Sequence, residues 1–208
     1  MKFNFNRFAE RTRGPGLLAV VLRGAVLAVG LQVLGLGLSY IAQLFLARWM
    51  GSLEYGRYAY AVAWATFLAV LAGLGLSTAS LRFLPQYLAA GEGGLARGFA
   101  LFSVWRVVPT GLGIALLVSG GSLWLGLNGW VYGYPLAVAA WMIPITALVA
   151  LKSEMARAIG RVALAYTPLQ ILRPLLLLGL AALVLTDSAH LGAVSVVSVA
   201  LLALALAA

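Results

Sequence analysis

The sequence predicts an all-α polytopic membrane protein with about six transmembrane helices. Of its 208 residues, 63% are hydrophobic and only 9% are charged, and its mean hydropathy is +1.04. Soluble domains carry roughly 25% charged residues. A helix needs about 20 consecutive apolar residues to cross a bilayer core about 30 Å thick. Uncharged stretches of this length recur along the chain, so a helical bundle embedded in the membrane is the fold class that fits.

The first two helices are predicted at residues 24–47 and 58–81. Each stretch is free of charge and has an arginine on both flanks. The ten residues between them contain two glycines, Gly51 and Gly56, which free the backbone for a turn. Their charged side chains can be hydrated where the chain meets the membrane surface. Residues 48–57 are therefore predicted to form a short hairpin loop.

The remaining helices follow from the spacing of charges and turn residues. No charge appears from residue 107 to residue 151, and this run is long enough for two helices. The pairs Gly120-Gly121 and Asn128-Gly129 are predicted to separate them. We place these helices at residues 98–118, 131–151, 167–186 and 191–208, with a basic loop at 152–161 and an outer loop at 187–190.

The orientation is predicted from the distribution of lysine and arginine, because basic residues are retained on the cytoplasmic side. The amino-terminal tail and the second and fourth loops together hold ten of them, whereas the loops on the opposite side hold two. Residues 1–23 are therefore predicted to be a basic cytoplasmic tail. The net charge of +9 then reflects topology and attraction to anionic lipid headgroups. Membrane lipid is an expected partner, and nucleic acid is not.

The reactive residue types are too sparse to predict an enzyme. The chain contains no cysteine and one histidine, His190, which lies near Asp187 in a predicted loop. Hydrolytic and metal sites need nucleophiles, bases or ligands in groups. No serine in a predicted helix has a base at helical spacing. We therefore expect no enzymatic activity, no cofactor and no metal site.

Polar residues in the first predicted helix share one face. At 100° per residue, Gln32, Ser39 and Gln43 fall within about 40° of one another. Thr66 lies on a similar face of small and polar residues in the second helix. Such residues either pack helices together or face a hydrated cavity, because leaving two glutamines toward lipid is costly. We treat Gln32, Ser39 and Gln43 as candidates for lining a cavity.

Two arginines inside predicted helices are further candidates. Arg106 lies about 13 Å beyond Arg97 along the third helix, so it either snorkels to the cytoplasmic interface or projects into a watery space where it could meet an anion. Arg173 lies near the start of the fifth helix, next to Pro174. It either anchors the cytoplasmic end of that helix or also faces the cavity.

The segment LARWMGSLEYGRYAYAVAWATFLAVLAGLGLSTASLRFLPQYLAAGE resembles bacterial polysaccharide flippases, including O-antigen flippases. These belong to the multidrug, oligosaccharidyl-lipid and polysaccharide exporter superfamily, whose patterns ARxxGxxEYGxYA and GLGxSTAxxRFxxxYxAxG it matches. The later segment ILRPLLLLGLAALVL, followed by HLGAV, is similar to the family's fifth and sixth helices. The matching residues are Ala47, Arg48, Gly51, Glu54, Tyr55, Gly56, Tyr58 and Ala59, and then Gly73, Gly75, Ser77, Thr78, Ala79, Arg82, Phe83, Tyr87, Ala89 and Gly91.

The resemblance implies a bacterial inner-membrane transporter with two six-helix lobes around a cavity that opens alternately to each side. It implies as substrate an oligosaccharide on a polyprenyl pyrophosphate, moved from the inner to the outer leaflet. The glycines and tyrosines of the first pattern are interpreted as structural. Arg48 and Arg82 lie close to opposite interfaces, where they either fix the hairpin and the topology or reach the cavity.

Six helices make one lobe of such a transporter. We therefore expect a second lobe, supplied by a continuation of this chain, which we interpret as an amino-terminal fragment, or by another protomer. Two other functions stay open. One is a membrane scaffold that recruits a glycan-assembly complex without transporting anything. The other is an exporter of cationic drugs, which would be expected to carry carboxylates inside the membrane, and the predicted helices contain none clearly.

Overall fold

The computed structural model describes residues 16–160, 168–187 and 192–207, and every regular element in them is a helix. In chain order these are α2 (Gly16–Ala72), α3 (Leu76–Ala89), α4 (Gly93–Leu127), α5 (Gly133–Ala139), α6 (Met142–Ala158), the π-helix η1 (Pro168–Leu172), α8 (Arg173–Asp187) and α9 (Ala193–Ala207). In lipid the backbone can satisfy its polar groups only within the protein, and a helix does so locally. The protein is thus a polytopic all-α membrane protein, as the composition predicts.

Three helical stretches are long and apolar enough to cross a membrane: Val29–Ala72, Gly93–Leu127 and Gly133–Ala158. Two shorter apolar helices, Gln170–Leu183 and Ala193–Ala207, accompany them. The first stretch bends at Gly51, which divides it into two arms and leaves more than 20 residues of it on each side. At about 1.5 Å per residue, each arm is long enough for a crossing of its own.

The predicted hairpin at residues 48–57 is a bend of a single residue. Helix α2 continues on both sides of Gly51, whose φ of 75° and ψ of 167° lie in a region that is open essentially to glycine alone. Gly56, in contrast, lies inside the second arm, so it does not form part of the turn. The first arm covers residues 16–50 and the second covers residues 52–72. The first arm begins within the predicted tail 1–23, of which residues 1–15 lie outside the described part.

The predicted helix at residues 58–81 is interrupted in its middle. Helix α2 ends at Ala72, and α3 begins at Leu76 after two residues of positive φ, Leu74 at 50° and Gly75 at 71°. Hydropathy gives no sign of this break, because the residues around it are as apolar as those of the helix. Discontinuous helices of this kind recur in membrane transport proteins.

The other helix ends also differ from those predicted. Helix α4 passes through Gly120-Gly121 and ends only at Leu127, before Asn128-Gly129. A glycine inside a helix costs about 1 kcal/mol, less than unpaired backbone groups cost in lipid. The predicted helix at 131–151 is two helices, α5 and α6, and α6 extends to Ala158. The predicted helices at 167–186 and 191–208 correspond to η1 with α8 and to α9, whereas residues 161–167 and 188–191 lie outside the described part.

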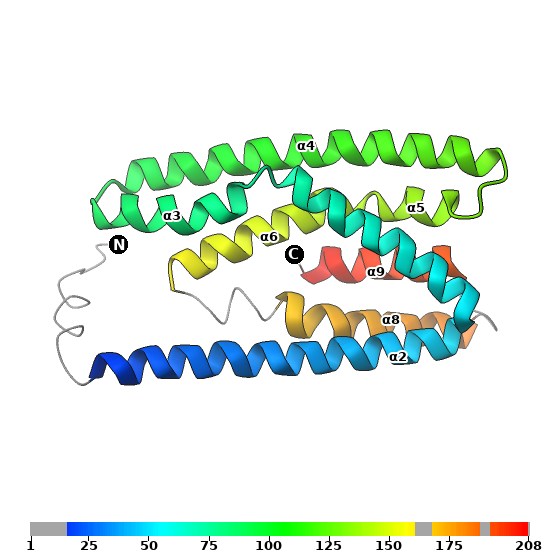
Figure 1. Cartoon of the computed structure of the whole chain (residues 1–208), viewed down its shortest axis with the longest axis horizontal. Coiled ribbons are helices and arrows are strands. Elements are labelled where there is room, and N and C mark those ends of the chain that lie inside the picture. The colour runs from blue at the N-terminus through cyan, green and yellow to red at the C-terminus, as the bar shows by residue number, and fades with distance from the viewer. Residues whose placement is uncertain (1–15, 161–167, 188–191, 208) are drawn as a thin grey trace.

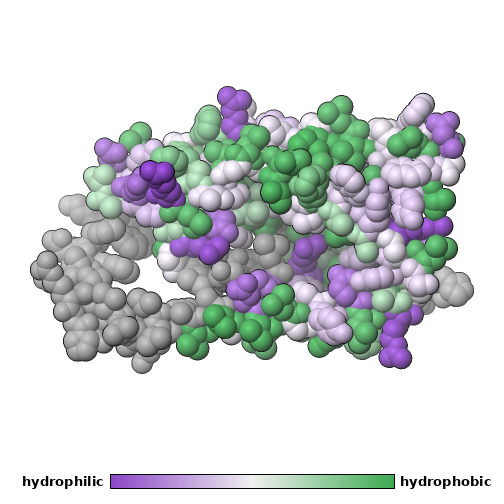
Figure 2. Space-filling view, in the orientation of Figure 1, coloured by the Kyte–Doolittle hydropathy of each residue, from purple (hydrophilic) through white to green (hydrophobic). Residues whose placement is uncertain are grey.

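The bundle is layered, with α4 along one long edge and the first arm of α2 along the other (Figure 1). Helices α8 and α9 fill the angle between the two arms and contact both α2 and each other, while α5 and α6 pack against α4. Large apolar side chains are exposed on both long edges, over α4 and over the first arm of α2, and Figure 2 shows green groups on each of them. This arrangement suits an exterior that faces lipid.

The core lies where the second arm meets the helices behind it. Four alanines of this arm recur every four residues or so and are almost completely buried: Ala61, Ala65, Ala69 and Ala72. Small side chains let helices approach closely, which is the main source of packing energy in a bilayer. The face of the second arm next to this alanine stripe turns toward the first arm. A cavity lies between the two.

Candidate functional site

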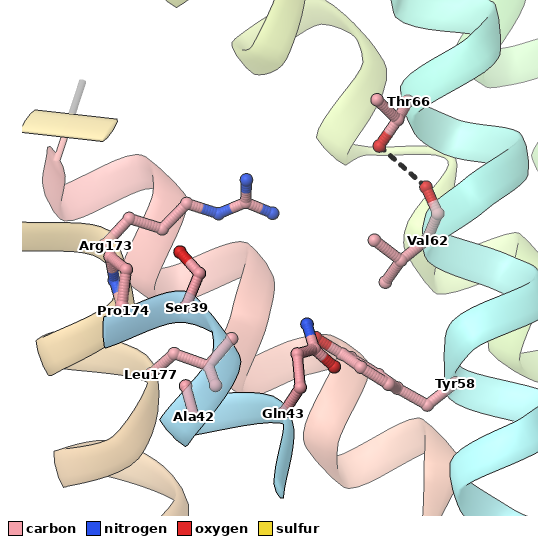
Figure 3. A pocket seen from close by; sticks show the side chains of 9 residues that line it. All are labelled: Ser39, Ala42, Gln43, Tyr58, Val62, Thr66, Arg173, Pro174 and Leu177. Carbon is pink, nitrogen blue, oxygen red and sulfur yellow. Dashed lines mark hydrogen bonds between the residues drawn. The ribbon is translucent and has the colours of Figure 1, made fainter. Parts of the chain in front are cut away.

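The cavity is partly open and has a volume of about 270 Å³. It is lined from three directions: by the first arm of α2, by its second arm and by the start of α8 (Figure 3). The lining residues are Ser39, Ala42, Gln43, Tyr58, Val62, Thr66, Arg173, Pro174 and Leu177. The two arms contribute together only because α2 turns sharply at Gly51.

Arg173 is the one charged residue among the described residues that line the cavity. It is the first residue of α8, it is half-buried, and its guanidinium group extends into the space between the arms (Figure 3). Among the described residues, no ion pair or hydrogen bond to Arg173 is present. A guanidinium keeps its charge at any physiological pH, and in an apolar bundle an unpaired one is costly. The cavity is therefore a place where an anion would be stabilised.

The start of α8 is held close to the first arm by a glycine. A Cβ added at Gly35 would lie 2.6 Å from the Cβ of Gln170 in η1 and 3.0 Å from its backbone oxygen. Only a residue without a side chain lets η1 approach the first arm this closely. This contact brings Arg173, three residues after Gln170, to the same cavity as Ser39 (Figure 3).

The neutral polar groups of the cavity come from both arms. The Ser39 hydroxyl points toward the same space as the Arg173 guanidinium, and the Gln43 amide lies further along the first arm (Figure 3). The Thr66 hydroxyl donates a hydrogen bond to the Val62 carbonyl oxygen at 2.8 Å, which leaves its lone pairs free. Tyr58 is only 2% exposed and extends from the second arm toward Gln43. No carboxylate lies among these lining residues.

The amide of Gln43 is tied across the bend. The Tyr55 hydroxyl donates a hydrogen bond of 2.8 Å to Gln43 Oε1, so a side chain of the second arm holds one of the first. The ring of Tyr55 packs beside that of Tyr58, with 6.1 Å between their centroids. Tyr55 does not line the cavity itself. It supports a residue that does.

Glu54 joins the bend to a distant helix. Its Oε2 accepts a hydrogen bond of 2.8 Å from the backbone N–H of Ala193, the first residue of α9, and its Oε1 pairs with Arg57. The first N–H groups of a helix lack partners within the helix, and its positive end attracts a carboxylate. The glycine, glutamate and tyrosine of the first sequence pattern thus have separate structural roles: the turn, the helix cap and the support of Gln43.

The remaining candidates lie away from the cavity. Gln32 is exposed on the first arm and does not line it. Arg106 lines a second, open pocket of about 480 Å³ whose lining residues all belong to α4, and its guanidinium carbon lies 5.6 Å from the centroid of the Phe102 ring. Arg48 and Arg82 are exposed, and Arg82 lies over the ring of Phe83 at 5.9 Å. Of the five predicted cavity residues, the structure brings together Ser39, Gln43 and Arg173.

Sequence reasoning missed two polar residues of the cavity as members of the site. Thr66 has a usable signal, because it lies on a polar face of its helix, but the pattern leaves open whether that face packs against helices or lines a cavity. Tyr58 belongs to the first pattern, whose tyrosines the sequence indicates only as structural. Both residues are missed for the same reason. The bend at Gly51 decides which faces of the two arms meet, and the sequence does not show its angle.

Helices of this length define a polytopic membrane protein, and the described lining of its cavity is cationic and holds no carboxylate. The chain belongs to the polysaccharide biosynthesis protein family, whose model matches residues 21–207. No curated protein and no solved structure matches it. The family agrees with the resemblance seen in the sequence and places the protein in the making of polysaccharides at a membrane.

Proposed function

We propose that this protein forms the amino-terminal lobe of a flippase for polyprenyl-pyrophosphate-linked oligosaccharide in the bacterial inner membrane, with its amino terminus in the cytoplasm. The observation that carries the proposal is the Arg173 guanidinium, which has no ion-pair partner among the described residues, in a cavity that no described carboxylate lines. Pyrophosphate oxygens are strong acceptors, and arginine binds them with paired, charge-assisted hydrogen bonds. Family membership supports the saccharide part of the substrate.

The size of the cavity supports a division of the substrate into three parts. A volume of about 270 Å³ suits a small anionic head group and lies below the usual range for whole ligands, about 300–1,000 Å³. The head group would occupy the cavity, the polyprenyl tail would stay in lipid, and the sugars would lie outside, toward the second lobe. That lobe comes from a continuation of the chain or from another protomer.

The absence of a lining carboxylate argues against an exporter of cations. A cationic substrate would meet the Arg173 guanidinium with no described negative group in the cavity to offset it. Repulsion between like charges in a medium of low dielectric constant is strong. An anionic substrate, in contrast, is attracted by the same guanidinium.

The test replaces Arg173 in the complete gene product and measures polysaccharide at the cell surface at matched protein levels. Arg173→Gln removes the charge, and we expect at least a tenfold loss of surface glycan, because a hydrogen bond to a charged group contributes about 1.5–3 kcal/mol. Arg157→Gln is the matched control, since this exposed arginine pairs with Glu154 outside the cavity. Unchanged export in the Arg173→Gln strain would overturn the flippase proposal and favour a scaffold.

A further inference from the structure

The hydroxyl of Tyr55 reaches the proposed anion site through Gln43. Its hydroxyl donates to Gln43 Oε1 at 2.8 Å, while the residue itself does not line the cavity. An amide has two different ends: the oxygen accepts hydrogen bonds and the NH₂ group donates them. A partner on the oxygen decides where the NH₂ group points. In Figure 3 the Gln43 nitrogen faces the open space between the two arms, and its oxygen lies on the far side.

We propose that Tyr55 is a positioning residue that fixes the Gln43 amide with its NH₂ group toward the anion bound beside Arg173. This inference rests on the proposed function, because it assigns a role in binding the pyrophosphate head group. With the amide held in this orientation, the first arm presents a donor to the cavity. Together with the guanidinium, it favours phosphate oxygens.

The support for Tyr55 is itself rigid. The neighbouring Glu54 is anchored to the first turn of α9, and the Tyr55 ring packs on Tyr58, which is almost fully buried. Binding groups are most effective when their own supports leave them little freedom. The hydroxyl is thus presented to Gln43 from a part of the lobe that is tied to α9 as well as to α2.

Removal of the Tyr55 hydroxyl takes away the donor on Gln43 Oε1, while the Tyr58 hydroxyl still interacts with the Gln43 side chain. Gln43 is exposed to the cavity, so its side chain can then rotate and present the carbonyl oxygen in place of the NH₂ group. An oxygen that faces a pyrophosphate oxygen repels it. The effect of losing the Tyr55 hydroxyl should therefore depend entirely on the presence of the amide at position 43.

A double-mutant cycle tests this dependence. The chain is purified in detergent, and the binding of farnesyl pyrophosphate is measured by calorimetry, with farnesol as the uncharged comparison. We expect Tyr55→Phe to weaken pyrophosphate binding about threefold to tenfold, the range for one neutral hydrogen bond. Gln43→Ala should have a similar effect, and the double variant should bind no more weakly than Gln43→Ala alone.

Two controls separate positioning from damage to the fold. Tyr60→Phe removes a phenol from the exposed side of the same arm and should leave binding unchanged. Farnesol should bind equally to the wild type and to every variant, because a merely structural loss would weaken both ligands. Melting temperatures measured on the same preparations show that each variant is folded.

The outcomes distinguish the two proposals. If the wild type does not prefer farnesyl pyrophosphate to farnesol, or if Arg173→Gln keeps that preference, the proposed function fails and the role of Tyr55 fails with it. If Arg173→Gln removes the preference but Tyr55→Phe binds like the wild type, only the role of Tyr55 is overturned. The role of Tyr55 is also overturned if Tyr55→Phe weakens binding by the same factor in the Gln43→Ala variant as in the wild type.

Discussion

Glu54 shows how a single charged residue is retained at the edge of an apolar bundle. Its carboxylate meets Arg57 on one side and the backbone N–H of Ala193 on the other, 139 residues later in the chain. Both contacts offset the cost of removing a charge from water. The residue therefore connects the bend of α2 to the first turn of α9, two places that nothing in the sequence links.

Replacement of Glu54 should loosen this connection. We expect Glu54→Ala to lower the free energy of unfolding by about 1–2 kcal/mol, the usual loss for a helix cap with a charge. The measurement is thermal unfolding in detergent followed by circular dichroism. Glu92→Ala is the matched control, because Glu92 precedes α4 but its side chain makes no hydrogen bond to the first turn. Equal losses in the two variants would show that the cap on α9 contributes nothing.

Gly51 and Gly56 form a natural pair for testing the bend. Gly51→Ala forces a side chain into a conformation of positive φ, which costs about 1–3 kcal/mol. Gly56 lies within the helix with nothing within 4 Å of an added Cβ, so Gly56→Ala should instead stabilise by roughly 0.5–1 kcal/mol. Thermal unfolding of the two variants should therefore shift in opposite directions. A loss at position 56 as large as that at position 51 would contradict a bend confined to one residue.

At the scale of elements, the break between α2 and α3 needs a partner from another helix. Where α2 ends, the carbonyl of Ala72 is left without the N–H that would follow in a continuous helix. The Thr110 hydroxyl of α4 lies 3.1 Å from this oxygen and shares its proton with carbonyls of its own helix. A polar group left unpaired in a bilayer is costly. The hydrogen bond from Thr110 lowers this cost at the break between α2 and α3.

Thr110→Val keeps the shape of the side chain and removes the hydroxyl. We expect a loss of about 1–2 kcal/mol in unfolding free energy, since the Ala72 carbonyl loses its described partner from another helix. Thr66→Val is the control, because the Thr66 hydroxyl bonds a carbonyl four residues earlier in its own helix, to which the helical N–H also donates. Equal losses of unfolding free energy in the two variants would show that the hydrogen bond across the break contributes no more than one within a helix.

Hydropathy locates the apolar helices but does not divide them. It finds the start of α9 to within two residues and the neighbourhood of α8, because charged or turn residues flank them. It cannot find the break at residues 73–75, which is made of leucine and glycine between apolar neighbours. It also predicts a loop around Gly51, where the charges of Arg48 and Glu54 suggest a longer turn than one glycine needs.

The candidate site, too, could be predicted only in part from the sequence. Helical periodicity correctly groups Ser39 with Gln43, because both lie on one face of one helix. The same calculation includes Gln32, which shares the face but lies beyond the end of the cavity. Periodicity also cannot say which face of α4 meets the bundle, and Arg106 lies on a face that the other described helices leave open. The contact of Gly35 with Gln170, which brings Arg173 into place, depends on packing between distant segments.

At the scale of the whole molecule, the two ends of the bundle differ in charge and in aromatic content. The turn between α3 and α4 and the turn between α4 and α5 lie at opposite ends (Figure 1). Helix α4 has 35 residues, about 52 Å, so it exceeds a bilayer core of about 30 Å and carries these turns beyond it. Arg82 and Arg97 lie near the first turn, while the contacting rings of Trp130 and Tyr132 lie at the second.

The orientation of the lobe can be read from these two turns because the chain contains no cysteine. Single cysteines are introduced as Glu92→Cys and Val131→Cys, both at exposed positions. Since arginines are retained in the cytoplasm, a maleimide that cannot cross membranes should label Val131→Cys in intact cells and leave Glu92→Cys unlabelled. After permeabilisation both should react, which shows that Glu92→Cys was protected by the membrane and not by the fold. Labelling of Glu92→Cys alone in intact cells would invert the lobe and place the start of α8, with Arg173, toward the outer side.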